Sequence, residues 1–195
     1  MTACGSAYHA GCVGRYVMEE LCRIPVSVEL ASELRYRNPI LDSHTLVIAI
    51  SQSGETADTI AALKECKARG AKTLAVVNVV GSTIAKIADY TLYTWAGPEI
   101  AVATTKAYST QMAVLNLLGL YFGDVMGTVD LETYSAMVRG IEALPGQMEQ
   151  VLEHTEDIRA AAKWLAGEED VFFLGRNLDY ALSLEGSLKL KEISY

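Results

Sequence analysis

The amino-acid sequence predicts an α/β fold, a three-layer αβα sandwich whose middle layer is a doubly wound parallel sheet. Short runs of branched aliphatic residues, typical of buried strands, alternate with longer segments in which apolar residues recur at helical spacing. The clearest run, residues 46–50, is followed by a polar turn and then by a helical pattern that Gly70 ends. Parallel strands joined by helices explain this alternation, because such strands are buried on both faces.

The first part of the chain contains the strands of this sheet. Strands are predicted where short apolar or β-branched runs occur, at residues 1–3, 25–30 (edge-like), 46–50, 73–78 and 90–94. Helices are expected between them, from after the turn at residues 4–7 to about residue 22, starting at residues 33–36, at 56–69 and at 83–88, the last capped by Ser82.

A long apolar helix is predicted at about residues 105–122, after Gly97 and Pro98 interrupt the chain. The segment is hydrophobic nearly all round, which indicates a core helix. It is too short for a membrane span and is interrupted by Asn116, so no membrane partner is expected.

The remaining sequence indicates a connecting arm and the opening of a second α/β unit. The arm is helical and more polar, and a break is expected at Pro145 and Gly146. A strand at 171–174 and a helix at 180–193 follow it. The predicted parts are a first domain at residues 1–128, connecting helices at 129–166 and a truncated second domain at 167–195.

Composition excludes several classes of protein. The chain of 195 residues has 51% hydrophobic residues and a formal charge of −8, and it shows no basic stripe for nucleic acid. Its four cysteines form no C-x-x-C pair and match no zinc spacing, so we expect buried or idle thiols and no metal.

The most informative segment is the turn after the strand at 46–50. It clusters three hydroxyls and one amide where a helix begins, at Ser51, Gln52, Ser53, Gly54, Glu55 and Thr56. Unpaired N–H groups at a helix start bind anions, so the turn suits a small phosphate. The same residue types also serve as ordinary helix caps, and the turn alone leaves both interpretations open.

Two further turns are expected at the same edge of the sheet, at residues 4–7 and 99–106. Ligands bind beyond the carboxyl ends of parallel strands, where neighbouring turns converge. The third turn has small residues that would let a ligand approach the backbone. Thr104 or Thr105 could equally be a simple cap of the long helix.

The predicted helix near the end of the chain carries a charged stripe. At about 100° per residue, Glu185, Lys189 and Glu192 lie within about 60° of one another. A carboxylate, an ammonium group and a second carboxylate therefore share one face. The alternative interpretation is a solvated face with a helical ion pair.

Four segments together resemble one enzyme family. ACGSAYHAG (3–11), SQSGETADT (51–59), EIAVATTKA (99–107) and LEGSLKLKEISY (184–195) are similar to the glucosamine-6-phosphate synthase family, the isomerising glutamine–fructose-6-phosphate aminotransferases. The resemblance runs along the whole chain and corresponds to the isomerase half, which is built from two sugar-isomerase (SIS) domains. It implies a first SIS domain followed by the start of a second.

The resemblance implies a role for each matching residue. Contacts to the 6-phosphate of fructose 6-phosphate would come from Ser51, Gln52, Ser53 and Thr56, with Gly5 and Ser6 adding to the substrate site. The sugar would lie against Val102, Ala103 and Thr104. Ala7 and Thr104 depart from the family pattern, which has Thr-Ser at positions 6–7 and often Ser at 104.

The charged stripe would carry the chemistry. Glu192 would move a proton between C1 and C2, because one carboxylate must reach both carbons, and Lys189 would assist the carbonyl and imine steps or orient Glu192. The family implies no cofactor, fructose 6-phosphate and glucosamine 6-phosphate as ligands, a homodimer and a cytoplasmic location. The glutaminase domain and the rest of the second SIS domain would be missing, so we expect the chain alone to be inactive.

The sequence leaves two alternative functions open. A sugar-phosphate-sensing SIS module of a regulator would bind without reacting and has no use for Glu192 beside Lys189. A single-domain ketose–aldose phosphate isomerase would not explain the second βα unit. The three histidines, His9, His44 and His154, fall outside the catalytic motifs and are expected to be structural or at the surface.

Overall fold

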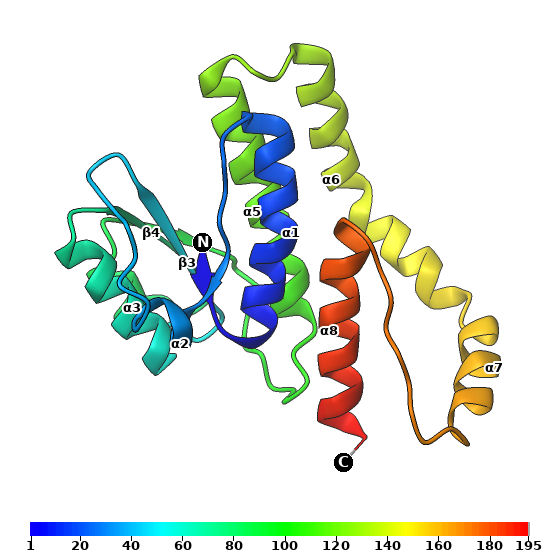
Figure 1. The fold of residues 1–195 in the computed structure, drawn as a ribbon. Coiled ribbons are helices and arrows are strands. Elements are labelled where there is room, and N and C mark those ends of the chain that lie inside the picture. The colour runs from blue at the N-terminus through cyan, green and yellow to red at the C-terminus, as the bar shows by residue number, and fades with distance from the viewer. Residues whose placement is uncertain (195) are drawn as a thin grey trace.

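A five-stranded parallel sheet forms the middle layer of the first domain in the computed structural model, which describes residues 1–194, and the helices that follow residue 130 lie to one side of the sheet (Figure 1). Tyr195, the last residue of the fourth family segment, lies outside the described residues. All neighbouring strands pair in parallel, in the order β2-β1-β3-β4-β5. The strands are β1 (Thr2–Ala3), β2 (Glu29–Leu30), β3 (Leu46–Ser51), β4 (Lys72–Val77) and β5 (Tyr90–Tyr93).

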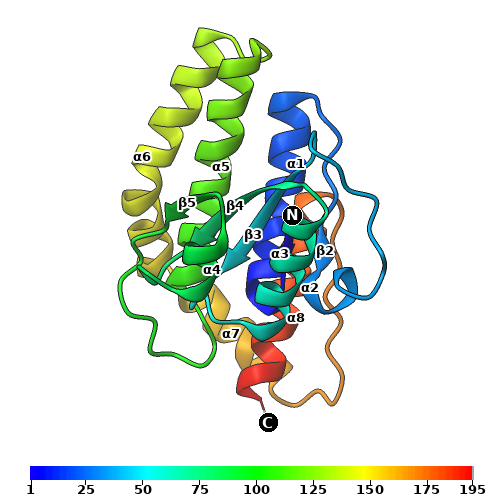
Figure 2. The ribbon, with the colours of Figure 1, turned by 90° about the vertical axis from the view of Figure 1, so that its left-hand side faces the viewer.

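Helices cover both faces of the sheet, as predicted for a doubly wound fold (Figure 2). The two long helices, α1 (Gly5–Cys22) and α5 (Lys106–Met126), pack on one face, where Ile48 and Ile50 of β3 join their core. The opposite face of the same strand buries Val47 and Ala49 against the shorter helices, which are α2 (Ala31–Leu34), α3 (Ala57–Ala68) and α4 (Thr83–Ile87). Alternate residues of one strand thus face two cores.

The strand order places a switch point between β1 and β3. The chain proceeds from β1 to β2 on one side and from β3 to β5 on the other. Crossovers leave the carboxyl ends of β1 and β3 in opposite directions, which opens a crevice between the turns that follow them. The first two predicted turns begin at this crevice, at Cys4 and Ser51.

Beyond α5 the chain is helical, with α6 (Leu131–Glu153), α7 (Glu156–Leu165) and α8 (Leu178–Ile193). The predicted break at Pro145 is wrong, because α6 continues through this residue and changes direction along its length (Figure 1). A proline removes one backbone hydrogen bond, which bends a helix without necessarily ending it. The last helix returns to the domain and lies against α1.

The predicted strand at 171–174 is also wrong. This segment is extended but forms no ladder in the described part of the chain, and Phe172 and Leu174 are 84% and 88% exposed. A strand requires a hydrogen-bonded neighbour, whereas periodicity reports only that the residues are apolar. The edge strand expected at 25–30 is similarly reduced to Glu29–Leu30, and the helix after it begins two residues earlier than predicted.

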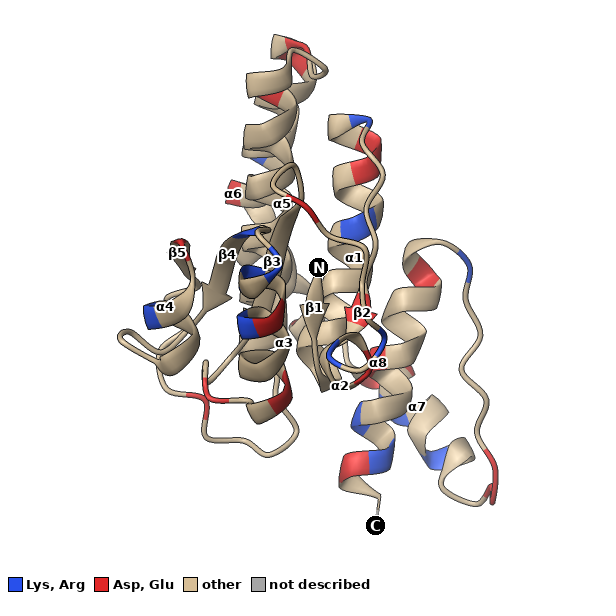
Figure 3. Ribbon diagram, turned by 60° about the vertical axis from the view of Figure 1, so that its left-hand side comes forward, with Lys and Arg blue, Asp and Glu red and all other residues tan. Residues whose placement is uncertain are grey.

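Helix α5 is only partly a core helix. Leu115 and Leu120 are buried against α1 and the sheet, whereas Leu117 and Tyr121 on the other side are 45% and 59% exposed. The predicted core helix therefore forms, but one of its sides stays exposed in the described chain. Acidic and basic side chains are interspersed over the helices (Figure 3). Within residues 1–194, no helix is both long and apolar enough to cross a membrane.

Candidate functional site

A small pocket of about 290 Å³ lies where the three predicted turns meet helix α8. Its size is at the small end of the range for ligand pockets. The predicted residues that line it are Ser6, Ser51, Gln52, Ser53, Thr56, Val102, Thr104, Lys189 and Glu192. Gly5 and Ala103 do not line it, although their neighbours in the chain do. The pocket thus joins residues from both ends of the sequence.

The hydroxyl groups of the β3–α3 turn are held by the turn's own backbone. Ser51 Oγ accepts a hydrogen bond from the Gly54 N–H at 3.0 Å, and Ser53 Oγ accepts one from the Glu55 N–H at 3.1 Å. Thr56 Oγ1 lies 3.2 Å from Ser51 Oγ. A serine that accepts a backbone N–H keeps its own proton to donate. In the Ser51–Thr56 contact one hydroxyl donates to the other, so the turn presents the remaining hydroxyl protons, including that of Ser53, to an anion.

These hydroxyls do not cap helix α3. Its N-cap residue, Thr56, makes no capping hydrogen bond with its side chain. The N–H groups of the first turn are therefore left for another partner, and the positive end of the helix dipole faces the same place. This geometry favours the anion-binding interpretation of the turn over simple capping.

Two hydrogen bonds join the β3–α3 turn to the start of helix α4. The Gly54 carbonyl accepts a hydrogen bond from the Ile84 N–H at 3.0 Å, and Glu55 Oε1 accepts one from the Thr83 N–H at 2.7 Å. The latter contact corrects the prediction for Ser82, which occupies the N-cap position of α4 but makes no capping hydrogen bond. Glu55 satisfies this helix start from another element.

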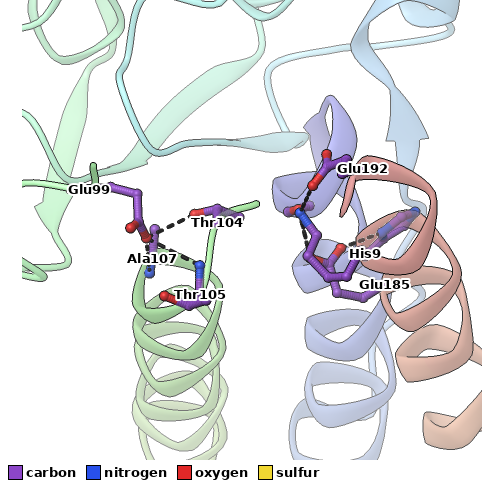
Figure 4. A network of polar contacts seen from close by, with 9 residues as sticks. His9, Glu99, Thr104, Thr105, Ala107, Glu185 and Glu192 are labelled. Carbon is purple, nitrogen blue, oxygen red and sulfur yellow. Dashed lines mark hydrogen bonds and ion pairs between the residues drawn. The ribbon is translucent and has the colours of Figure 1, made fainter. Parts of the chain in front are cut away.

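The charged stripe of α8 forms as predicted. Lys189 Nζ pairs with Glu192 and lies 3.5 Å from Glu185 Oε1 (Figure 4). Lys189 and Glu192 face the pocket and are partly exposed, at 23% and 29% of their side-chain area. Glu185 is nearly buried and does not line the pocket.

Buried Glu185 connects α8 to the start of α1. It accepts a hydrogen bond from Ser6 Oγ at 2.7 Å, and His9 Nδ1 lies 2.7 Å from its other oxygen (Figure 4). Burial raises the pKa of Glu185, but the contacts with His9, Ser6 and Lys189 outweigh burial and hold it below the ordinary value. Because Ser6 donates its proton to Glu185, that hydroxyl is already engaged in the absence of a ligand.

The third turn is organised by Glu99. Its Oε2 accepts hydrogen bonds from Thr104 Oγ1, the Thr105 N–H and the Ala107 N–H, at 3.0, 3.3 and 3.2 Å. Thr105 occupies the N-cap position of α5 but makes no capping hydrogen bond with its side chain. Glu99, rather than Thr104 or Thr105, therefore satisfies this helix start.

Sequence reasoning missed several groups around the pocket. Glu99 and the buried Gln111 line it without having been singled out, and His9 reaches the charged cluster through Glu185. An acidic residue ahead of a helix is a capping signal, but no spacing rule connects residues 99 and 107. His44 and His154 are exposed, as expected.

Burial affects cysteine thiols in the described part of the chain. Burial raises the pKa of the Cys22 and Cys66 thiols, which keeps them protonated. All four cysteines are free. No cluster of three or more His, Cys, Asp or Glu side chains that could hold a metal ion occurs among residues 1–194.

Comparison with known proteins identifies the fold and the family. A family model described as the SIS domain matches residues 1–121, which is more than half of the chain. The chain belongs to the SIS domain family. This SIS domain accounts for the sheet, for α1–α4, for most of α5 and for the three turns that line the pocket, whereas α8 lies outside the matched segment.

Curated relatives of this SIS domain include proteins named as isomerising glutamine–fructose-6-phosphate aminotransferases. The chain is 60% identical over all 195 residues to the glutamine–fructose-6-phosphate aminotransferase (isomerizing) of Symbiobacterium thermophilum, and 56% identical to that of Clostridium tetani. It spans 32% of the length of each of these relatives.

Solved structures of similar proteins share the fold of this chain. The C-terminal domain of glucosamine-fructose-6-phosphate aminotransferase from Francisella tularensis superposes on the whole chain with a TM-score of 0.96 and 35% identity, and the chain covers 55% of it. A Silicibacter pomeroyi protein named as a phosphosugar isomerase matches 99% of the chain with a TM-score of 0.83 and 27% identity, with 56% of that protein covered. The α/β architecture is therefore that of SIS domains.

Proposed function

We propose that this SIS domain and its α8 form the sugar-phosphate site of an isomerising glutamine–fructose-6-phosphate aminotransferase. The observation that carries the proposal is the meeting of the Ser51–Thr56 turn with Lys189 and Glu192 in one pocket. An anion site and a proton-transfer group are thereby held at opposite ends of a small ligand. The names of the relatives support the reaction class.

In the proposed complex, the phosphate of fructose 6-phosphate binds the hydroxyls and the free N–H groups at the start of α3. Ser51, Gln52, Ser53 and Thr56 surround it, while Val102 and Thr104 line the sugar. Binding the remote phosphate fixes the position of C1 and C2 and raises the effective concentration of the reacting groups. A net charge of −8 makes this local anion site necessary.

The proposed chemistry moves one proton between two carbon atoms and a second from oxygen to nitrogen. Ammonia condenses with the C2 carbonyl and water leaves, which gives an imine. Glu192 takes a proton from C1 while the imine nitrogen gains one, which forms the enolamine. Glu192 then returns its proton to C2 while the C1 hydroxyl loses its proton and becomes the aldehyde, so the proton lost from O1 balances the proton gained by nitrogen. Lys189, paired with Glu192, offsets negative charge as it develops or orients that carboxylate.

We also propose, from the relatives, the location, the oligomeric state and the further domains of a longer protein that contains this chain. The chain spans about a third of the length of these relatives. It would act in the cytoplasm as part of a homodimer, with a glutaminase domain and a completed second SIS domain at residues 167 onward. Residues 1–128 would be the first SIS domain and 129–166 the connection. The chain alone is expected to form no glucosamine 6-phosphate. The sensing alternative would leave the Lys189–Glu192 pair without a role.

Calorimetric titration with fructose 6-phosphate and glucosamine 6-phosphate tests the site. Ser51→Ala is expected to weaken binding by about 1–3 kcal/mol, because a buried hydroxyl donor is lost. Glu192→Gln should leave phosphate affinity nearly intact. Ser43→Ala, an exposed serine at the opposite edge of the sheet, is the matched control. Equal affinity of Ser51→Ala and the parent would refute the phosphate assignment.

A second measurement separates catalysis from sensing. In an aminotransferase of full length that carries this segment, we expect Glu192→Gln to abolish exchange of the sugar C1 proton with deuterated water while binding persists. Exchange at the parent rate in that variant would instead support a site that binds without using Glu192.

A further inference from the structure

Glu99 is a polar group of the pocket to which the proposed reaction assigns no role. Its Oε2 collects three hydrogen bonds, from the Thr104 hydroxyl and from the Thr105 and Ala107 N–H groups, across the pocket from α8 (Figure 4). The Ala107 N–H leads the contacts that hold the pKa of Glu99 below its ordinary value. The carboxylate is therefore ionised at neutral pH.

The first consequence concerns where an anion can bind. Helices α3 and α5 both begin at the pocket, but only α5 has a carboxylate on its first N–H groups. Glu99 offsets the positive end of the α5 dipole and repels a second negative charge. The first turn of α3 also contains an acidic residue, Asp58, but its carboxylate pairs with Arg35 at 3.1 Å and accepts no hydrogen bond from the first N–H groups of α3. The start of α3 therefore remains the favourable place for phosphate.

The second consequence concerns the Thr104 hydroxyl. A hydroxyl has one proton, and the Thr104 proton is donated to Glu99. Toward a ligand, the Thr104 oxygen is therefore an acceptor, which matches the hydroxyl groups of a sugar and not the oxygens of a phosphate.

We infer that Glu99 is a positioning residue that sets the direction in which a sugar phosphate lies in the pocket. Its negative charge disfavours phosphate binding at the start of α5. Its hydrogen bond with Thr104 leaves the Thr104 oxygen to accept a hydrogen bond from a sugar hydroxyl. This inference rests on the proposed function, because it describes how the ligand of that site is oriented. Glu99 acts through the 99–107 segment and takes no part in proton transfer.

Calorimetry with two probes, inorganic phosphate and glucosamine 6-phosphate, tests the inference on the 195-residue chain. The measured quantity is the dissociation constant for inorganic phosphate divided by the dissociation constant for glucosamine 6-phosphate. This ratio isolates the contribution of the sugar. In Glu99→Ala we expect this ratio to fall about 3- to 10-fold, the worth of one hydrogen bond. The phosphate stoichiometry should rise from one to two, because the start of α5 becomes free.

Two variants serve as comparisons. Thr104→Val removes the acceptor without touching Glu99, so it should lower the ratio equally, and the double variant should lose nothing more. Asp130→Ala is the matched control, because Asp130 also accepts a backbone N–H at the start of a long helix, α6, but lies outside the pocket. Its ratio and stoichiometry should equal those of the parent.

Failure of the role of Glu99 and failure of the proposed function would give different results. Binding of both probes with an unchanged ratio and stoichiometry in Glu99→Ala overturns the role of Glu99 and leaves the proposed function standing. If the parent chain binds neither probe, the proposed function falls, and this inference falls with it. Should Glu99→Ala not fold, an unchanged ratio in Thr104→Val overturns the inference by itself.

Discussion

Gly54 illustrates how a single residue shapes the pocket. Its φ of +66° lies in the left-handed region, and a Cβ at this position would overlap the Ser82 side chain at the start of α4. Only glycine lets the turn pass this close to α4 while Ser51 Oγ receives the Gly54 N–H. The pocket therefore depends on a residue that contributes no side chain to it.

Gly54→Ala is expected to lower the free energy of unfolding by about 2–4 kcal/mol, from steric overlap and backbone strain together. Urea unfolding measures this loss. Gly127→Ala is the matched control, since Gly127 has a φ of +69° but open space around it, and it should lose only the strain contribution. Equal losses in the two variants would show that the Ser82 contact is unimportant.

At the scale of elements, Asp89 connects strand β4 and helix α3 at the start of strand β5. Its Oδ2 accepts hydrogen bonds from the Thr73 N–H and hydroxyl of β4, and Oδ1 pairs with Lys67 Nζ of α3, just before β5 begins. The Lys67 and Thr73 contacts lower the pKa of Asp89 from 3.8 to about 2. The stabilisation is therefore present above pH 3.8 and is lost as the pH falls toward 2.

Asp89→Asn is expected to be about 1 kcal/mol less stable than the parent at neutral pH, because charged hydrogen bonds are weakened. The difference between the two proteins should shrink as the pH falls from 3.8 toward 2, where the parent carboxylate also loses its charge. Urea unfolding of both proteins across this range measures the difference. A difference that stays constant with pH would contradict this account.

At the scale of the whole molecule, the site exists only where α8 returns to α1. Residues 6 and 185 are separated by 179 positions in the chain, yet Ser6 and Glu185 share a hydrogen bond of 2.7 Å. His9 adds a second contact from α1. These bonds place Lys189 and Glu192 beside the turns of the sheet, so the proposed phosphate end and the proposed proton-transfer end of the pocket belong to different parts of the chain.

Glu185→Ala is expected to loosen α8, because His9 and Ser6 lose a buried partner at a cost of about 1–3 kcal/mol. Amide hydrogen exchange in α8 should accelerate while exchange in β3 and β4 stays slow, since local opening is independent of the sheet. Glu192→Ala, on the same helix but more exposed, should leave exchange in α8 nearly unchanged. Similar acceleration in both variants would exclude a specific role for Glu185.

The amino-acid sequence determined most elements of the first domain and the candidate residues. Alternating apolar runs predicted the parallel sheet, and the hydroxyl-rich turn and the Glu185–Lys189–Glu192 stripe were recognisable within single segments. Within a segment, the repeat of a helix or strand fixes the spacing of side chains, so such patterns are reliable. The expected strand at 171–174 is wrong because pairing involves a neighbour that periodicity does not describe.

Only the tertiary structure decided which partner each polar group takes. Ser6 donates to Glu185, Glu99 satisfies the start of α5, and Glu55 satisfies the start of α4. Each of these contacts joins residues whose separation in the chain implies no distance in space. Packing of helices on the sheet sets those distances, and burial then requires each polar group to find a partner nearby.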